Sequence, residues 1–260
     1  MSKREALIDA DILAYQAASV AEKPVDWGDG LWTLHAFEDE AKAHFTRTLD
    51  NILEKTGATE VTLAWSDTDN WRKDVYPMYK SNRSSSRKPM LLKFVREWAS
   101  AQYFSVKTAR LEGDDVMGIL ATDPALSGKY IICTIDKDLK CIPGVHYNFG
   151  NDTSFEINTH EADRWHMTQA LTGDATDGYP GCTGIGPKTA EKILQVALEE
   201  GTPWAKNQDL VNLYWKHIVK AYEKAGLTEE FALSQAQVAR ILRHGEYDKQ
   251  TEEVKLWKPT

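Results

Sequence analysis

The sequence predicts an α/β fold in which a mostly parallel central sheet is covered by helices. Three short apolar runs, at residues 6–11, 61–65 and 129–135, have the length of buried strands, and each ends in or runs into acidic residues. Segments with helical spacing separate them. Strands that alternate with helices indicate parallel pairing, with helices on the faces of the sheet.

The remaining elements follow in chain order. Apolar residues at helical spacing between 41 and 53 predict an amphipathic helix, which Gly57 ends. Further elements are predicted as a helix over 91–98, a strand over 103–108 and a helix over 114–121, and the chain is mainly helical from residue 159. The predicted domains are 1–158 (α/β core, with a basic helical segment at 71–100), 159–200 (helical) and 201–260 (helical, unassigned). The Gly/Pro/Asp-rich stretch 173–187 is the candidate junction between the sheet layer and the helical layer.

The composition narrows the class of protein. The chain has 260 residues and a formal net charge of −8. It contains no apolar stretch long enough to span a membrane and no signal-peptide pattern, so we expect a cytoplasmic protein without a membrane partner. Three cysteines without Cys-x-x-Cys spacing predict neither a disulfide framework nor a zinc site; we expect Cys133, Cys141 and Cys182 to be buried.

Acidic residues recur where the predicted strands end and where a predicted helix begins. The carboxyl ends of parallel strands meet at one edge of a sheet, so these carboxylates are expected to converge. Two unit charges about 5 Å apart repel by roughly 3 kcal/mol at an effective dielectric near 20, which favours bound cations, and hard cations such as Mg²⁺ prefer oxygen ligands. For any single acid, a helix cap or turn is the favoured interpretation, but four acidic groups at strand ends with paired spacing are less readily explained in this way. The acids are Asp9, Asp11, Asp67, Glu112, Asp114, Asp115, Asp136, Asp138, Asp174 and Asp177.

A basic, aromatic segment between Trp71 and Arg96 carries eight Lys and Arg residues against one acid, Asp74. Aromatic faces stack on bases and cations neutralise phosphates, so the segment is typical of a surface for single strands or frayed ends. A solvated basic loop is the commoner origin of a charge run, but it would not require the interleaved aromatic residues. The predicted DNA contacts here are Arg72, Lys73, Arg87 and Lys88.

The turn from Gly181 to Thr189 superficially resembles a phosphate-binding P-loop. Pro187 stands where that motif needs Lys, and no strand precedes it, so nucleotide binding is disfavoured. A hairpin of two helices fits better. Its glycines would let backbone amides approach a DNA phosphate at a helix start, with Lys188 and Lys192 nearby.

Together these motifs resemble the 5′-nuclease superfamily, the flap endonucleases and 5′ to 3′ exonucleases. The most specific block is Gln169-Ala-Leu-Thr-Gly-Asp174-x-x-Asp177-Gly-x-Pro-Gly-x-x-Gly184-Ile-Gly186-Pro-Lys-Thr-Ala190. Glu112-Gly-Asp-Asp115, Asp136-x-Asp138 and Tyr79-Lys-x-Asn-Arg83 follow the family's other motifs. The resemblance covers residues 6–195 and is closest to the small exonucleases of tailed bacteriophages.

The resemblance implies a PIN-like nuclease core and a two-metal site for Mg²⁺ or Mn²⁺. One metal would be held by Asp9, Asp67, Glu112, Asp114 and Asp115, and the second by Asp136, Asp138, Asp174 and Asp177. Lys80 and Arg83 would steady the scissile phosphate from a helical gateway, and Tyr79 would stack on a terminal base. The family usually has Asp-Gly-Asn where this chain has Asp9-Ala-Asp11, which leaves the role of Asp11 open.

The same resemblance implies that the turn is a helix-three-turn-helix motif, which in this family grips duplex DNA and often holds a K⁺ ion. The implied contacts are Gly184, Gly186, Lys188 and Thr189. The predicted function is therefore metal-dependent hydrolysis of DNA from 5′ ends or 5′ flaps by a monomer, in phage replication or recombination. Two alternatives stay open: a ribonuclease that includes RNA/DNA hybrids among its substrates, and a non-catalytic protein that binds DNA ends.

Overall fold

The computed structural model describes residues 4–83, 86–201 and 206–260, and its contacts divide the chain into two compact units. The first unit comprises Met1–Asp69, Ser86–Asp136 and Gly144–Glu156. The second comprises Asn70–Ser85, Lys137–Pro143 and Ile157–Thr260. The chain thus enters the second unit twice before residue 157, whereas the sequence predicted a continuous core up to residue 158.

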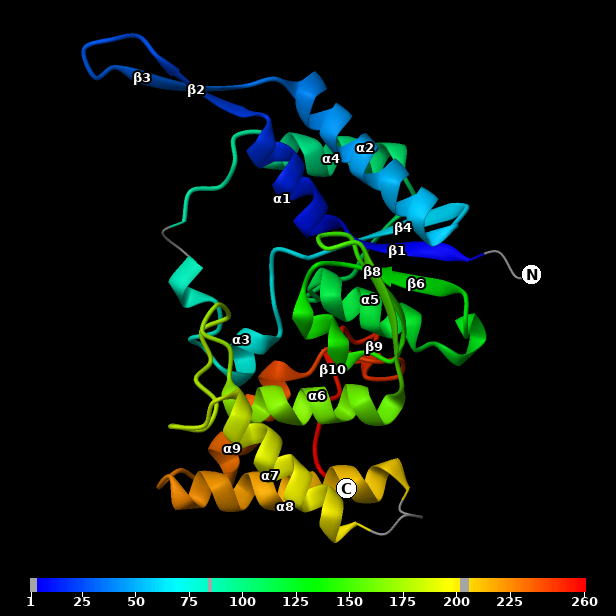
Figure 1. Cartoon of the computed structure of the whole chain (residues 1–260), viewed down its shortest axis with the longest axis vertical. Helices are drawn as coiled ribbons and strands as arrows, with labels where there is room; N and C mark the ends of the chain where they lie inside the picture. Colours follow the sequence, from blue (N-terminus) through cyan, green and yellow to red (C-terminus); the bar gives the residue numbers. More distant parts are fainter. Residues whose placement is uncertain (1–3, 84–85, 202–205) are drawn as a thin grey trace. The chain divides into compact units, whose positions relative to one another are not determined.

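A six-stranded sheet forms the centre of the first unit, in the order β5-β4-β1-β6-β7-β8 (Figure 1). Strand β1 pairs in parallel with both β4 and β6, and it is buried along its whole length. This burial on both faces explains the unbroken apolar run at its centre. The predicted mostly parallel α/β sheet is confirmed. The strands are β1 (Glu5–Asp9), β4 (Glu60–Trp65), β5 (Ser105–Lys107), β6 (Tyr130–Cys133), β7 (Gly144–Asn148) and β8 (Thr153–Ile157).

Helices cover both faces of this sheet. Helices α1 (Ala10–Val20), α2 (Glu38–Thr56) and α4 (Leu92–Gln102) pack on one another on one side, and α5 (Gly113–Ala121) packs against β1, β4 and β6 on the other (Figure 1). The aromatic rings of Phe45, Trp98 and Tyr103 meet in the core below α2 and α4. The short 3₁₀ helix η2 (Pro124–Leu126) precedes β6.

The predictions for the N-terminal quarter were incomplete. Strand β1 ends at Asp9 instead of Asp11, because Asp9 caps α1 and its carboxylate accepts a hydrogen bond from the Ile12 amide. The sequence analysis missed α1, in which Ala residues contribute most of the buried face and leave little periodic contrast. It also missed the antiparallel hairpin of β2 (Glu22–Asp26) and β3 (Trp32–Ala36).

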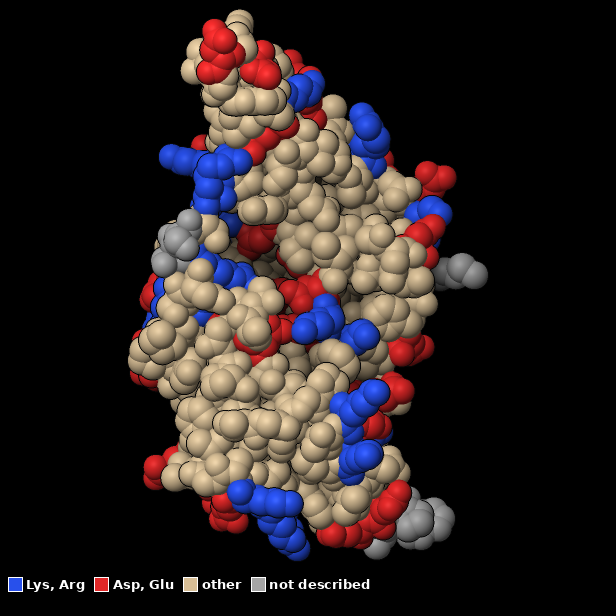
Figure 2. All heavy atoms as spheres, turned by 60° about the vertical axis from the view of Figure 1, so that its left-hand side comes forward, with Lys and Arg blue, Asp and Glu red and all other residues tan. Residues whose placement is uncertain are grey.

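The β2–β3 hairpin exposes large apolar residues, which is why its pattern does not indicate a buried strand. Trp27, Leu31 and Trp32 are 63%, 61% and 59% exposed. Acidic side chains gather at the tip of the hairpin (Figure 2). An exposed apolar tip with acidic neighbours is a poor surface for a polyanion.

The predicted helical gateway at 71–100 is helical only in part. It contains the single turn α3 (Arg72–Val75), the 3₁₀ turn η1 (Ser81–Arg83) and α4. Pro77 and Pro89 interrupt regular helix, and Lys80 adopts a left-handed backbone with φ of 54°. Its two ends belong to different units, since 70–85 lies in the second and 86–100 in the first.

Helices α6, α7, α8 and α9 form the core of the second unit, in which the large buried side chains include Leu171, Leu194, Tyr214 and Trp215. Helix α6 contacts each of the other three, and α3 packs against α9. The segment after residue 200, predicted as a separate domain, thus shares one core with the helices before it. The helices are α6 (Thr159–Thr172), α7 (Pro187–Glu200), α8 (Asn207–Lys224) and α9 (Glu229–Ala239), with η3 (Lys137–Cys141) and the small pair β9 (Tyr247–Asp248) and β10 (Glu253–Val254).

The stretch 173–187 joins α6 to α7 inside the second unit, so it is not the predicted junction between a sheet layer and a helical layer. Gly173 and Gly181 have φ of 62° and 64°, and a Cβ on Gly181 would lie 2.2 Å from the Gly173 amide nitrogen. Only glycine fits where the two backbones touch this closely. The turn is therefore a packed corner.

Two expectations from composition can be compared with the structure. No helix among the described residues is long and apolar enough to cross a membrane. Cys133, Cys141 and Cys182 are buried free thiols, as predicted.

Candidate active site

The site begins at Asp9, the last residue of β1. Its side chain is only 4% exposed, and it accepts a hydrogen bond from the Thr134 hydroxyl at 2.8 Å. Burial raises the pKa of Asp9 to about 7, the Thr134 bond opposes this rise, and the carboxylates of Asp11 and Asp136 add to it. A buried carboxyl with acidic neighbours is costly to ionise without a cation. Asp9 therefore has the environment of a metal ligand.

Asp11 lies in the first turn of α1, where protein donors occupy both of its oxygens. It accepts from the Ser66 amide at 2.7 Å and pairs with the Arg96 guanidinium. Arg96 in turn donates to the Ser66 carbonyl at 2.9 Å. These bonds tie α1 and α4 to the end of β4, so the departure from the family's first motif has a positioning role.

The N-terminus of α5 docks at the same edge. A Cβ on Gly113 would lie 3.3 Å from the Ala64 carbonyl and 3.4 Å from the Asp11 carboxylate. The Gly113 amide donates to the Ser66 hydroxyl at 2.9 Å. This close approach brings the Glu112–Asp115 segment to the carboxyl end of β4, and the carboxylate of the fully buried Asp115 accepts from the Glu112 amide.

Asp67 and Asp136 complete the acids of the first unit. Asp67 pairs with Lys107 at 2.8 Å and accepts from the Arg110 amide at 2.9 Å, and these two bonds lower its pKa to about 2. Asp136 follows β6, and its amide donates to the Thr134 hydroxyl that also binds Asp9. The first unit thus gathers six of the nine predicted ligands: Asp9, Asp67, Glu112, Asp114, Asp115 and Asp136.

The second unit holds the other three around Tyr179, a residue that sequence reasoning missed. Burial raises the pKa of Tyr179 well above 10, and the nearby charges of Asp138, Asp174 and Asp177 raise it further. Asp174 is 8% exposed and pairs with Lys137 at 2.9 Å. Although burial opposes it, this pair and backbone donors hold the pKa of Asp174 below its usual range.

The predicted phosphate-binding residues Lys80 and Arg83 both lie beside the carboxylate of Asp177. This carboxylate accepts from the Tyr79 hydroxyl at 2.9 Å and from Arg83 at 2.5 Å, and the Lys80 ammonium lies 3.6 Å away. The Lys80 amide donates to the Asp177 carbonyl at 2.7 Å. Residues almost a hundred positions apart are therefore joined in one network. Tyr79 is 3% exposed, with the Lys80 ammonium over its ring.

The other predicted DNA contacts are divided by exposure. Arg72 is 2% exposed and donates to the Val238 and Arg240 carbonyls at 2.9 and 2.6 Å, so it anchors α3 to α9 and offers no surface to DNA, contrary to the prediction. Lys73 and Lys88 are exposed, and Arg87 pairs with Glu22 at 2.5 Å. The turn residues Gly184, Gly186, Lys188 and Thr189 are all exposed.

In the described part of the chain, no group of three or more His, Cys, Asp or Glu side chains is placed to hold a metal ion. The donors at the strand ends are nevertheless all carboxylates, and Asp9 is buried beside other acids. Magnesium keeps several waters and needs few carboxylates. The donor set therefore fits a hard divalent ion, although the side chains do not form a closed cage.

No local pattern pointed to Lys107, which pairs with Asp67 from the end of β5. Lys137 could have been found, since it stands between Asp136 and Asp138 in the chain.

Several known proteins are similar to this chain. Residues 4–164 match the family model described as 5′-3′ exonuclease, N-terminal resolvase-like domain. The exodeoxyribonuclease of Enterobacteria phage T3 is 33% identical, over 97% of this chain and 92% of that protein. The exonuclease of Escherichia phage T7 is 34% identical, over 97% of this chain and 93% of that protein.

A solved structure shares the fold. The D15 protein of phage T5, co-crystallised with metal ions, matches with a TM-score of 0.58 and 14% identity, covering 91% of this chain and 93% of that chain. The T5 D15 flap endonuclease has also been solved with DNA and metal ions, with a TM-score of 0.57 and 13% identity over 91% of this chain and 99% of that chain.

Proposed function

The chain belongs to the 5′-3′ exonuclease family, and from that premise we propose that it hydrolyses DNA from 5′ ends with two bound Mg²⁺ or Mn²⁺ ions. The main support for a metal site is the position of Asp9. Its carboxyl is buried at the end of β1, and Asp11 and Asp136 are close enough to raise its pKa. The T5 D15 protein, which shares the fold, was crystallised with metal ions.

The proposed ligands keep the two predicted sets. Asp9, Asp67, Glu112, Asp114 and Asp115 would serve one ion, directly or through water, and Asp136, Asp138, Asp174 and Asp177 the other. Ions of this kind supply Lewis acidity and neutralise charge that develops on a phosphodiester. The ion pair with Lys107 keeps the Asp67 carboxyl ionised, which is the form that would bind a cation.

Lys80 and Arg83 are proposed to bind the scissile phosphate. Both now lie at the Asp177 carboxylate, and Lys80 is fixed through its backbone amide as well. Cations held in place need little rearrangement to stabilise charge on the phosphate in the transition state. Tyr79 is buried, with the Lys80 ammonium over its ring, so it does not offer the ring face that the sequence led us to expect for a terminal base; its hydroxyl instead donates to Asp177 and helps to hold that carboxylate.

The turn before α7 is proposed to grip the duplex, with a K⁺ ion as an additional part of that proposal. A Cβ on Gly184 or Gly186 would meet nothing within 4 Å, so their backbones are open to solvent. A phosphate at this helix start would also be favoured by the positive end of the α7 dipole. Exposed Lys188 and Thr189 stand beside it.

The substrate in this proposal is double-stranded DNA with a 5′ end or 5′ flap. The T3 relative is named an exodeoxyribonuclease, and T5 D15 was solved with DNA. Action as a monomer in the cytoplasm of an infected host belongs to the same proposal, because the relatives named above are phage proteins.

Two carboxylate variants test the site. Asp138→Asn and Asp177→Asn should lower Mg²⁺-dependent cleavage of a 5′-labelled duplex by at least about 100-fold, because each removes a proposed ligand charge. Duplex binding, measured by fluorescence anisotropy in Ca²⁺, should persist. The matched control is Asp39→Asn, whose side chain is 97% exposed. Full activity in both variants would refute the assignment.

The same assay separates DNA from RNA. A 5′-labelled RNA strand in an RNA/DNA hybrid is run beside the DNA duplex. Faster release from the hybrid would favour primer removal over exodeoxyribonuclease activity.

A further inference from the structure

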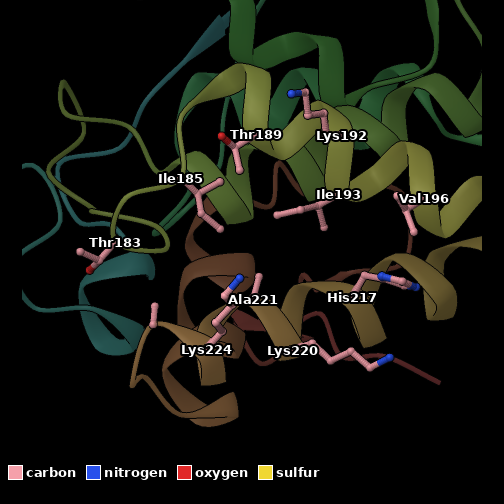
Figure 3. Close-up of a pocket in the computed structure, with 11 residues that line it drawn as sticks. Thr183, Ile185, Thr189, Lys192, Ile193, Val196, His217, Lys220, Ala221 and Lys224 are labelled. Atoms are coloured by element: carbon pink, nitrogen blue, oxygen red, sulfur yellow. The ribbon is translucent and has the colours of Figure 1, made fainter.

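A groove runs between α7 and α8 in the second unit (Figure 3). Its cavity measures about 590 Å³. Ile185 and Ile193 point into the space between the two helices, and Val196, 49% exposed, lies further along α7. Apolar side chains therefore form most of the floor, in a protein whose other large apolar residues are mostly buried.

Lysines surround this floor. Lys192 stands on α7, while Lys220 and Lys224 stand on α8, and the Lys224 side chain reaches toward the groove (Figure 3). All three are exposed, and none takes part in an ion pair among the residues that the structure describes. The carboxylate of Glu200 lies 3.0 Å from the His217 imidazole at one end. The His217 hydrogen bond and the charges of Lys216 and Lys220 lower the pKa of Glu200. The rim is thus cationic apart from this acid at one end.

The proposed nuclease function accounts only for the end of this groove at Thr189, which is also a proposed duplex contact, and not for the apolar floor at Ile193 and Val196. The duplex contacts proposed above lie at the turn 184–189, and DNA backbones are bound by polar and cationic groups. An apolar floor gains nothing from a phosphate, whereas it gains about 25 cal/mol for each Å² of apolar surface that a ligand covers. A cationic rim around an apolar floor complements a ligand that carries both carboxylates and a bulky apolar side chain.

We propose that the α7–α8 groove binds an acidic segment of a partner protein, anchored by one or two bulky apolar side chains. From Thr189 to Val196 the α7 wall is roughly 10 Å long at 1.5 Å per residue, so the segment is short. Its apolar side chains cover Ile193 and Val196, and its carboxylates face Lys192, Lys220 and Lys224. Binding here recruits the nuclease and leaves hydrolysis of naked DNA unchanged.

Methyl NMR tests this directly. The protein is labelled at the isoleucine δ1 methyl groups and titrated with a synthetic ten-residue peptide that contains five Asp and Glu residues, one Leu and one Phe. We expect saturable shifts of the Ile193 methyl with a Kd in the range of about 10 to 100 μM. A second peptide, in which Ser replaces Leu and Phe, should bind at least about tenfold more weakly.

Charge reversal supplies the matched comparison. Lys220→Glu with Lys224→Glu should weaken peptide binding by at least about tenfold, since it inverts the rim. Lys249→Glu with Lys255→Glu makes the same charge change at exposed residues outside the groove and should leave peptide binding unaltered. Cleavage of naked duplex DNA should be the same in all of these variants.

Three results would overturn the proposal. The first is no shift of Ile193 at 1 mM peptide. The second is equal binding of the two peptides, which would reduce the effect to nonspecific charge attraction. The third is that duplex DNA shifts Ile193 while Lys220→Glu with Lys224→Glu weakens duplex binding, which would make the groove part of the DNA surface. The proposed nuclease function would survive the first two results, since its own tests use different residues.

Discussion

At the scale of single residues, Asp9 is a proposed metal ligand whose buried carboxyl lowers the stability of the fold when it ionises. An acid whose pKa is raised on folding stabilises the fold below its unfolded value of 3.8, and this stabilisation is lost as the pH rises through about 7. At pH 8 without metal, Asp9 is therefore ionised at the expense of the fold. This cost is what a bound cation would offset.

Asp9→Asn should accordingly have opposite effects on stability and on activity. At pH 8 in EDTA it should raise the free energy of unfolding by about 1 to 3 kcal/mol, because the neutral amide avoids the buried charge. It should also lower Mg²⁺-dependent cleavage by at least about 100-fold. Urea denaturation at pH 5 and pH 8 measures the first effect.

The comparison between the two pH values is the control. At pH 5 the folded carboxyl is largely protonated whereas the unfolded one is already ionised, so the gain in stability from Asp9→Asn should be clearly smaller than at pH 8. A variant that is less stable than wild type at pH 8 would mean that the Asp9 charge is compensated inside the fold.

Lys80 provides a second residue-scale prediction. Lys80→Met should reduce the single-turnover cleavage rate by about 100-fold, because it removes a cation proposed to act on the scissile phosphate. The Kd for duplex should change by less than about threefold, since one phosphate contact contributes little to total affinity. Lys255→Met is the control at an exposed site. A large rise in Kd with an unchanged rate would make Lys80 a binding residue only.

At the scale of elements, the turn before α7 uses its glycines in two ways. Gly181 fills a place where a Cβ would lie 2.2 Å from backbone, and its φ is 64°. Gly186 begins α7 with φ of −95° and open space around it. The first glycine is required by packing and the second is free to serve a ligand.

Alanine substitutions separate these roles. Gly181→Ala should destabilise the protein by more than about 3 kcal/mol, because backbone must move to admit the methyl group. Gly186→Ala should leave the melting temperature within about 2 °C. It should weaken duplex binding by about tenfold if a phosphate approaches that backbone. If the folded Gly186→Ala variant binds duplex as tightly as wild type, the backbone at Gly186 does not contact the DNA.

Elements with strong periodic contrast were predictable from the sequence. The apolar spacing of α2 and the unbroken apolar centre of β1 identified them. Helix α1 lacked contrast because its buried face is mostly alanine, and the β2–β3 hairpin exposes its tryptophans. The gateway could not be read correctly because the left-handed turn at Lys80 is fixed by a bond to Asp177, far along the chain.

The candidate site was predictable as a set of acids and not as a set of contacts. The strand ends identified Asp11 and Asp136, whose charges act on Asp9, and the 112–115 segment identified the acids that α5 brings to the end of β4. Nothing local indicated that Lys107 balances Asp67 or that Arg72 is buried under α9, because both depend on tertiary packing.

At the scale of the whole molecule, the protein has a net charge of −8 and yet is proposed to bind a polyanion. The proposed ligand carboxylates repel phosphate until cations neutralise them. Duplex affinity should therefore rise by about tenfold on going from EDTA to Ca²⁺ at constant ionic strength, as measured by anisotropy. Asp9→Asn should show a smaller rise. Equal duplex affinity in EDTA and in Ca²⁺ would mean that the proposed ligand carboxylates do not lie near the bound DNA.

The most direct test of the nuclease is a time course on a duplex labelled at one 5′ end, with Mg²⁺ and then with excess EDTA. A metal-dependent 5′ exonuclease should release labelled mononucleotides or short oligonucleotides as its first products, and EDTA should stop their release. Label that stays in long fragments, or release that continues in EDTA, would contradict a metal-dependent enzyme that begins at the 5′ end.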